Sequence, residues 1–167
     1  MSRAAIGLGA NLPSHAGTPA QTIAAATARL AEYGAVVARS GLYRTAPVGY
    51  VAQPDFLNAA LVLETALSPL ALLDAMLEIE RNYGRDRTQG PPKGPRTLDL
   101  DLLLMDALVL EEPTLTLPHP AMHARRFVLA PLAEIAPAWE HPVLHCTMAE
   151  LLAALPQNAG AVTRISE

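Results

Sequence analysis

Apolar and polar positions alternate along the first half of the chain in a way that predicts a strand, a helix and two further strands. The apolar run over residues 4–9 is typical of a short buried strand. Thr18-Pro19-Ala20-Gln21 then supplies an N-cap, a first-turn proline and a capping-box glutamine for a helix that ends near Gly34. Residues 36–45 and 57–65 are expected to form strands, with a proline- and glycine-bearing loop between them.

The second half adds a helix and a strand and then ends in helices. Ser68-Pro69 caps a helix with leucines at near-helical spacing, and Gly84 ends it. A polar loop over residues 85–94 leads into a strand over residues 96–105. The remaining expected elements are a small hairpin from residues 108–110 and 115–117, and C-terminal helices over residues 126–135 and, from a capping box, 147–155.

The order βαββαβ, followed by C-terminal helices, favours one fold class. It is the ferredoxin-like pattern of two split units rather than a parallel Rossmann sheet. We therefore expect an α+β fold whose antiparallel sheet is flanked by helices in three layers, αβα. At 167 residues, the chain is expected to form a single domain over 1–167.

Composition and charge argue against several function classes. The net charge of -4 and the sequence pI near 5.7 give no electrostatic footprint for nucleic acid. Cys146 is the only cysteine, so neither an intramolecular disulfide nor a cysteine-based zinc site is expected. No apolar run suits a secretory signal or a membrane span, so we expect a cytoplasmic protein with no membrane partner.

Two carboxylates in a strand otherwise made of leucines are the strongest chemical signal. The segment over residues 94–101 puts Asp99 and Asp101 on one face of the expected strand and the leucines on the other. Mg²⁺ is commonly held by one or two carboxylates plus substrate phosphates. Nearby basic residues suit such an anion: Arg85, Arg87, Lys93 and Arg96. The residues leave a second interpretation open, in which strand-end aspartates are simply salt-bridged.

Two glycine motifs bear on nucleotide binding, and both argue against a standard phosphate loop. Gly7-Leu8-Gly9 follows a strand and precedes a helix, but the third glycine of a dinucleotide fingerprint is missing. We therefore expect a tight turn after the strand. A Walker A loop is absent, since Lys93 is followed by Gly94 and not by Ser or Thr.

A histidine cluster follows the expected hairpin. His119 and His123 are four residues apart, but Pro120 would disrupt a helix and no carboxylate stands where a zinc protease needs it. His119, fixed between two prolines and close to Arg125, is suited to bond a phosphate or a hydroxyl. For His123 we expect a surface position or a position behind the residues that contact a ligand.

The two phenylalanines of the chain offer a platform for a flat ring. Phe56 and Phe127 both lie beside polar loop residues, and Asn58 shares the strand face of Phe56. A heteroaromatic ring sandwiched between the phenylalanines is one interpretation. Ordinary packing of both rings in the core is the other.

Four segments, in order and over nearly the whole chain, are similar to one enzyme family. They are residues 43–49, 53–60, 94–101, and 118–120 with 125–127. Together they resemble 6-hydroxymethyl-7,8-dihydropterin pyrophosphokinase. The resemblance implies a ferredoxin-like fold, and an enzyme that transfers the pyrophosphoryl group of ATP to the pterin hydroxymethyl, releasing AMP, in folate biosynthesis. It implies two Mg²⁺ ions, ATP and a reduced pterin as ligands, and no obligate protein partner.

The same resemblance implies roles for individual residues. Asp99 and Asp101 are similar to the ligands of the two Mg²⁺ ions, and Arg85 and Arg96 join them as catalytic residues. The implied ATP-binding residues are Glu80, Arg87, Thr116, His119 and Arg125. The implied pterin-binding residues are Thr45, Val48, Gly49, Phe56, Asn58 and Phe127, with the two phenylalanines stacked on the faces of the ring.

Two other functions use the same residues differently. A Mg²⁺-dependent phosphohydrolase would release inorganic phosphate from ATP and would need no pterin. A ferredoxin-like small-molecule sensor would keep the two aspartates salt-bridged, and Mg²⁺ would not change its ligand affinity. Analysis of the reaction products separates these possibilities.

Overall fold

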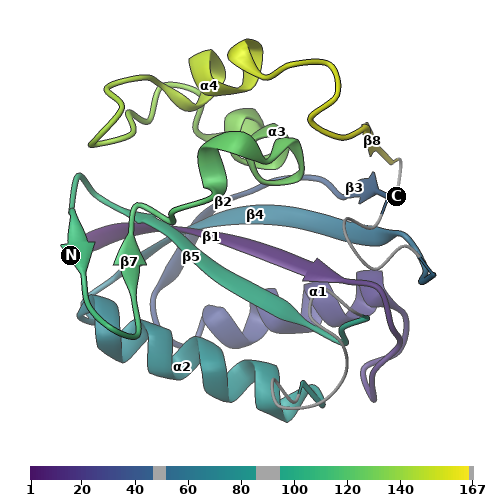
Figure 1. Cartoon of the computed structure of the whole chain (residues 1–167). Helices are drawn as coiled ribbons and strands as arrows, with labels where there is room; N and C mark the ends of the chain where they lie inside the picture. Colours follow the sequence, from purple (N-terminus) through teal and green to yellow (C-terminus); the bar gives the residue numbers. More distant parts are fainter. Residues whose placement is uncertain (47–51, 86–94, 166–167) are drawn as a thin grey trace.

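The computed structural model describes residues 1–46, 52–85 and 95–165, and an antiparallel sheet with helices on both faces dominates it (Figure 1). Helices α1 and α2 cover one face of the sheet and α3 and α4 the other, which gives three layers. The elements in chain order are β1 (Ser2–Ala10), α1 (Pro19–Leu30), β2 (Ala35–Arg39), β3 (Tyr43–Thr45), β4 (Phe56–Thr65), α2 (Pro69–Asn82), β5 (Asp99–Met105), β6 (Leu110–Glu111), β7 (Thr116–Leu117), the 3₁₀ turn η1 (Met122–Ala124), α3 (Arg126–Ile135), α4 (Met148–Ala154) and β8 (Val162–Arg164).

The main sheet has the predicted ferredoxin-like topology. Its strands lie in the order β5-β1-β4-β3-β8, and β2 also pairs with β4. β1 is antiparallel to both β4 and β5, so the first strand of the chain lies in the centre of the sheet. The α+β class and the three-layer arrangement expected from the sequence are thereby confirmed.

Alternation of side chains along β1 divides the apolar residues between two cores. Ala4, Ile6 and Leu8 face α1 and α2, and all three are buried. Ala5 faces the other way, into the core beneath α3 and α4. The glycines at positions 7 and 9 share the face of Ala5, because residues two apart lie on the same side of a strand.

The predicted helix caps are present. The Thr18 side chain accepts from the backbone of Gln21, whose own side chain returns to the N-cap, and Thr147 forms the same capping box with Glu150. The Ser68 side chain caps α2. α1 ends at Leu30, before the expected Gly34, because Gly34 already belongs to the turn that packs on the β4 backbone.

Several predicted boundaries were wrong. The strand expected over residues 36–45 is divided into β2 and β3, since Gly41 donates to the Glu134 side chain of α3 instead of continuing the ladder. β5 begins at Asp99, because the backbone of Arg96 bonds to Asn11. The glycine motif forms no turn: Gly7 and Gly9 both lie inside β1. β8 and η1 were not predicted.

The expected small hairpin exists in a shortened form. β6 pairs with β7 in a separate two-stranded sheet, with Leu110 opposite Leu117. Within the described ranges, no helix is long and apolar enough to cross a membrane.

Candidate active site

The register of the sheet brings the main polar residues into one row. Gly9 of β1 lies opposite Asp99 of β5 on one side and opposite Asn58 of β4 on the other. Asp101 lies opposite Gly7 in the same way. Since neither glycine has a side chain, the face of the sheet between the aspartates and Asn58 stays open.

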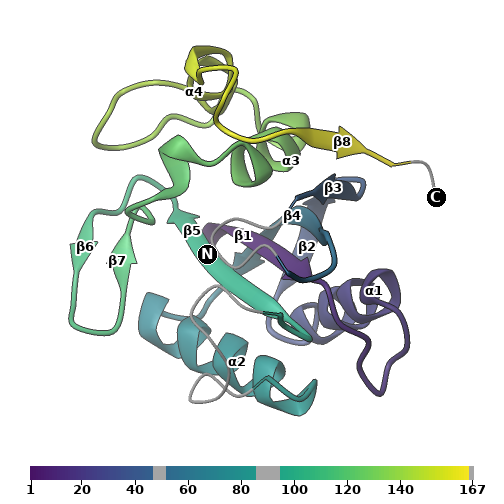
Figure 2. The same cartoon turned by 45° about the vertical axis from the view of Figure 1, so that its right-hand side comes forward.

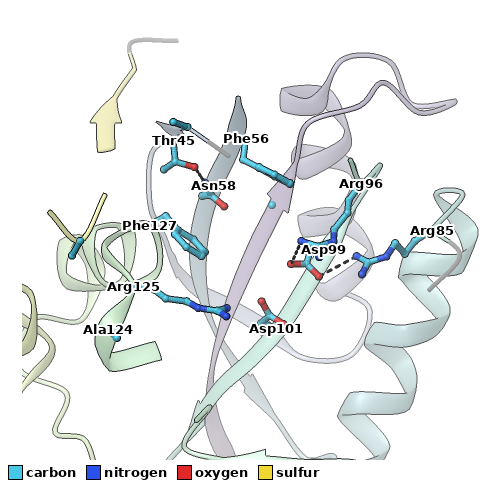
Figure 3. A pocket seen from close by; sticks show the side chains of 13 residues that line it. Thr45, Phe56, Asn58, Arg85, Arg96, Asp99, Asp101, Ala124, Arg125 and Phe127 are labelled. Atoms are coloured by element: carbon cyan, nitrogen blue, oxygen red, sulfur yellow. Dashed lines mark hydrogen bonds and ion pairs between the residues drawn. The ribbon is translucent and has the colours of Figure 1, made fainter. Parts of the chain in front are cut away.

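A cavity of about 350 Å³ lies over this row, between the sheet and the start of α3 (Figure 3). Figure 3 shows Asp99 and Asp101 projecting from β5 toward Arg125, and Phe127 lying across from Phe56. The lining residues are Gly9, Thr45, Ala46, Phe56, Asn58, Arg85, Arg96, Asp99, Asp101, Ala124, Arg125, Phe127 and Ala159.

One end of the cavity is charged. Arg85 Nη1 lies 3.1 Å from Asp99 Oδ1, and Arg96 Nη1 lies 3.9 Å from Asp99 Oδ2. The salt-bridged arrangement that the sequence left open is therefore present at Asp99. The salt bridges do not remove the metal-binding interpretation, because Asp99 keeps 24% of its side chain exposed, in a cavity that three arginines line.

Glu80 fixes this charged end from below. Its Oε2 accepts from the backbone N–H of Leu100 at 2.7 Å and lies 4.0 Å from Arg85 Nη1. Arg85 in turn donates to the Leu98 carbonyl at 3.0 Å. Glu80 is only 1% exposed and does not line the cavity, so the structure places this expected ATP-binding residue beneath the site.

The other end of the cavity is aromatic, and two arginines border it: Arg96 Cζ lies 6.0 Å from the centroid of the Phe56 ring, and Arg125 Cζ lies 5.6 Å from that of Phe127. Phe56 and Phe127 both line it and neither is fully buried, as a ring-stacking role requires. Asn58 is buried and its Nδ2 donates to Thr45 Oγ1 at 2.9 Å, which holds the amide in place on β4. The four neutral residues, predicted from the sequence, are brought together.

The side chain of Asn11 links the two segments that carry Arg96 and Phe56. Its Oδ1 accepts from Arg96 N at 2.8 Å, and its Nδ2 donates to Gln53 Oε1 and to the Pro54 carbonyl, each at 2.9 Å. The side chain is 3% exposed. Asn11 thereby fixes the segment that carries Arg96 against the segment that leads into Phe56.

The histidines lie apart from the lining. His119 is half-buried, and burial and then the charge of Arg125 lower its pKa, while Asp99 opposes them. Its Nδ1 accepts from Ala121 N at 3.2 Å, which leaves Nε2 as the donor of the neutral ring. His123 is exposed, as expected. Thr116 is exposed on β7 and is not brought to the cavity.

Other positions were either missed by the sequence or lie outside the described ranges. Gly9, Ala46, Ala124 and Ala159 line the cavity without having been predicted. The alternation of β1 could have identified Gly9, whereas small residues on a loop or turn give no such signal. The expected residues Val48, Gly49 and Arg87, and also Lys93, lie outside the described residues.

The donor set suits a hard cation that shares its coordination with a ligand. Asp99 and Asp101 both line the cavity, on one face of β5. No group of three or more His, Cys, Asp or Glu residues in the described ranges could enclose an ion. Two carboxylates fit Mg²⁺, which keeps several positions for water and substrate phosphates.

Comparisons with known proteins agree with this geometry. The family model described as 7,8-dihydro-6-hydroxymethylpterin-pyrophosphokinase matches residues 5–137. A Synechocystis protein named 2-amino-4-hydroxy-6-hydroxymethyldihydropteridine pyrophosphokinase is 41% identical over 151 residues, which cover 89% of this chain and 74% of the relative. A Pseudomonas aeruginosa protein of the same name is 48% identical over 121 residues, covering 72% of this chain and 73% of the relative.

Larger proteins contain a similar region. The Schizosaccharomyces pombe folic acid synthesis protein fol1 is 44% identical over 119 residues, which cover 71% of this chain but 16% of that protein. The structure of Plasmodium falciparum HPPK-DHPS wild type with pteroate matches 91% of this chain and 44% of its own, with a TM-score of 0.69 and 16% identity. At that identity the likeness supports the fold alone.

Proposed function

Because the chain belongs to the 7,8-dihydro-6-hydroxymethylpterin-pyrophosphokinase family, it is a pyrophosphokinase of folate biosynthesis, and we propose that the cavity described above holds ATP and the reduced pterin. One observation carries the assignment of the site. The same cavity has one end with two aspartates and Arg85, another end with two phenylalanines and a fixed amide, and Arg96 and Arg125 between the two. A triphosphate suits the first end, and a flat heteroaromatic ring suits the second.

The aromatic end positions the acceptor. Phe56 and Phe127 stack on the pterin, and Asn58 bonds the polar edge of the ring, because its amide is already held by Thr45. This leaves the hydroxymethyl group directed along the sheet face toward Asp99 and Asp101. Holding the two reactants in line supplies much of the rate in phosphoryl-type transfer, since little covalent help from the protein is needed.

The charged end binds ATP, the pyrophosphoryl donor, and stabilises the negative charge that develops on the phosphates during transfer. Arg85, Arg96 and Arg125 neutralise the phosphates of ATP, while the hydroxymethyl oxygen attacks the β-phosphorus and AMP leaves. Asp99 and Asp101 would hold two Mg²⁺ ions, which would supply charge neutralisation at the phosphates. Glu80 keeps Arg85 and β5 in their relative positions.

Product analysis tests the reaction. The protein is mixed with MgATP and 6-hydroxymethyl-7,8-dihydropterin, and AMP is expected to appear in step with the pterin diphosphate. Release of inorganic phosphate without consumption of pterin would indicate the phosphohydrolase instead. ATP binding that yields no product, and that Mg²⁺ does not affect, would indicate the sensor.

The metal assignment has its own test. Asp99→Asn and Asp101→Asn are each expected to lower turnover by about 100-fold or more, because they remove ligands of the ions that neutralise the phosphates. Asp74→Asn, on the exposed face of α2, is the matched control. Mn²⁺ binding measured with a non-hydrolysable ATP analogue should weaken in the first two variants. Unchanged Mn²⁺ binding in both would refute the assignment.

The family also bears on protein partners and on location in the cell. We propose that the enzyme acts without an obligate protein partner, since relatives of similar length carry the same name. A cytoplasmic location, expected from the sequence, stays a prediction.

A further inference from the structure

The segment after α4 closes one side of the cavity, although it lies beyond residue 137, where the match to the family model ends. Figure 2 shows this segment passing α3 and ending as β8 beside β3. Val162 lies opposite Thr45 in that pairing, and Ile165 N donates to the Leu42 carbonyl at 2.9 Å. Ala159, three residues before Val162, lines the cavity. Thr45 lines the same cavity, so the segment that carries Ala159 pairs with the strand that contributes Thr45 to the aromatic end.

Arg126 fixes the turn that carries Ala159. Its Nη1 donates to the Gly160 carbonyl at 2.7 Å, and its Nη2 donates to the Pro156 carbonyl at 3.1 Å. Ala159 N donates to the same Pro156 carbonyl at 3.0 Å. Gly160 has a φ of 105°, a backbone conformation that residues with a side chain rarely adopt. The guanidinium therefore holds a tight turn in one defined conformation.

A second anchor holds the end of the segment. Glu134 of α3 accepts from Tyr43 Oη at 2.6 Å and from Arg164 Nε at 3.0 Å, and its other oxygen accepts from Gly41 N at 3.1 Å. One carboxylate thus joins α3, β3 and β8. Arg126 and Glu134 lie on the same helix as Phe127, so the helix that presents the aromatic ring also positions the segment beside it.

We propose that residues 156–165 form a wall of the pterin site, in which Ala159 contacts the bound pterin and limits the size of the ring that fits. Arg126 is a positioning residue that holds this wall. The proposal rests on the proposed function, because it takes the ligand of the aromatic end to be the reduced pterin. It assigns a role in substrate specificity to a segment outside the region that the family model describes.

Enlarging the wall residue tests the contact. Ala159→Leu is expected to raise the KM for the pterin by about tenfold or more and to leave the KM for ATP within about twofold, because the added side chain enters only the aromatic end. Ala153→Leu is the matched control, since Ala153 is exposed on α4, outside the proposed wall, and does not line the cavity. It should keep both KM values.

Removing the guanidinium tests the positioning role. Arg126→Gln is expected to raise the KM for the pterin by about fivefold with little change in kcat, and Arg126→Lys should recover part of the loss through one remaining charged donor. Arg29→Gln controls for loss of a partly exposed arginine, because Arg29 lies on α1, which covers the face of the sheet opposite α3. A merely structural role would instead lower the melting temperature and affect both substrates.

Hydrogen exchange on the wild-type enzyme gives a readout that needs no variant to fold. Addition of the pterin with a non-hydrolysable ATP analogue is expected to slow exchange over residues 157–161 relative to the analogue alone. Pterin KM values equal to wild type in Ala159→Leu and Arg126→Gln, or unchanged exchange in this segment, would overturn the proposal. Failure of the wild-type enzyme to form pterin diphosphate would instead overturn the proposed function itself.

Discussion

At the scale of single residues, Phe127 is the side chain whose removal should most clearly affect binding of one substrate more than the other. Phe127→Ala is expected to weaken pterin binding by about tenfold or more, since loss of a central aromatic anchor typically costs about 2 kcal/mol. ATP binding should change less, because Asp99 still holds Arg85 and Arg96 in place, although Arg125 loses the ring beside it. Arg96→Ala should show the opposite pattern.

Calorimetric titration of both variants with each ligand measures this difference. Equal losses for ATP and pterin in Phe127→Ala would mean that the ring acts through core packing, where its partly buried side chain already contacts the core beneath α3 and α4. Retained pterin affinity would rule out the stacking role.

The site residues that could be predicted from the sequence are those whose side chains differ in type from their sequence neighbours. Asp99 and Asp101 stand out in a strand of leucines, and Phe56 with Asn58 follows the period of a strand face. Ala159 carries no such signal, because a small apolar residue becomes part of a cavity only through the path of the chain around it. Gly9 was misjudged, since a glycine pair after a strand also suits a turn.

At the scale of elements, Glu80 joins α2 to β5. Glu80→Ala is expected to destabilise the protein by about 1–3 kcal/mol, because the buried N–H of Leu100 loses its acceptor. Glu80→Gln should cost less, since its amide oxygen can still accept that hydrogen bond. Denaturant unfolding of the two variants, with the exposed Glu78→Gln as control, measures the order of the three stabilities.

Activity separates two roles for this residue. If Glu80 only supports Arg85 and β5, Glu80→Gln keeps the KM for ATP close to wild type. A large rise in that KM in a variant of normal stability would return Glu80 to the ATP-binding residues that the family resemblance implied.

The elements themselves show which signals a sequence contains. Helix starts were predicted correctly at Thr18, Ser68 and Thr147, because capping is a local interaction within a few residues. β8 was missed, since three residues with one valine have no strand pattern, and the groups that hold it beside β3 lie far away in the sequence, Glu134 among them. The division of β2 from β3 depends on the same distant carboxylate, through Gly41.

At the scale of the whole molecule, His141 makes the stability depend on pH. It is 4% exposed, and its Nδ1 accepts from the backbone N–H groups of Val143 and Leu144 at 3.2 and 3.1 Å. Burial, and then the charges of His123 and His145, lower its pKa from the ordinary 6.5. A histidine with a lowered pKa takes up its proton more readily in the unfolded chain, so stability is complete above about pH 6.5 and falls as the pH drops toward the folded-state pKa.

His141→Asn tests this dependence, because the amide oxygen of Asn can replace the Nδ1 acceptor and does not titrate. Between pH 7 and pH 5, the free energy of unfolding should fall more steeply for the wild type than for the variant. His119, whose pKa is also lowered, titrates in both proteins and cancels in the difference. The exposed His15→Asn is the control, and parallel curves for wild type and His141→Asn would contradict the assignment.

The separation of charge within the cavity also gives the two substrates different responses to ionic strength. The charged groups among the described lining residues are two aspartates and three arginines, whereas the residues proposed to contact the pterin are neutral: Phe56, Phe127, Asn58 and Thr45. At 0.15 M salt the screening length is about 8 Å, so the attraction of a polyanion to partly exposed arginines weakens as salt is added, while ring stacking does not. For a protein of net charge -4, local attraction to these arginines must also overcome a repulsive overall field.

Raising potassium chloride from about 0.05 M to about 0.5 M should therefore lower the affinity for the nucleotide and leave the affinity for the pterin nearly constant. At high salt, binding of the nucleotide would therefore limit the rate of the reaction.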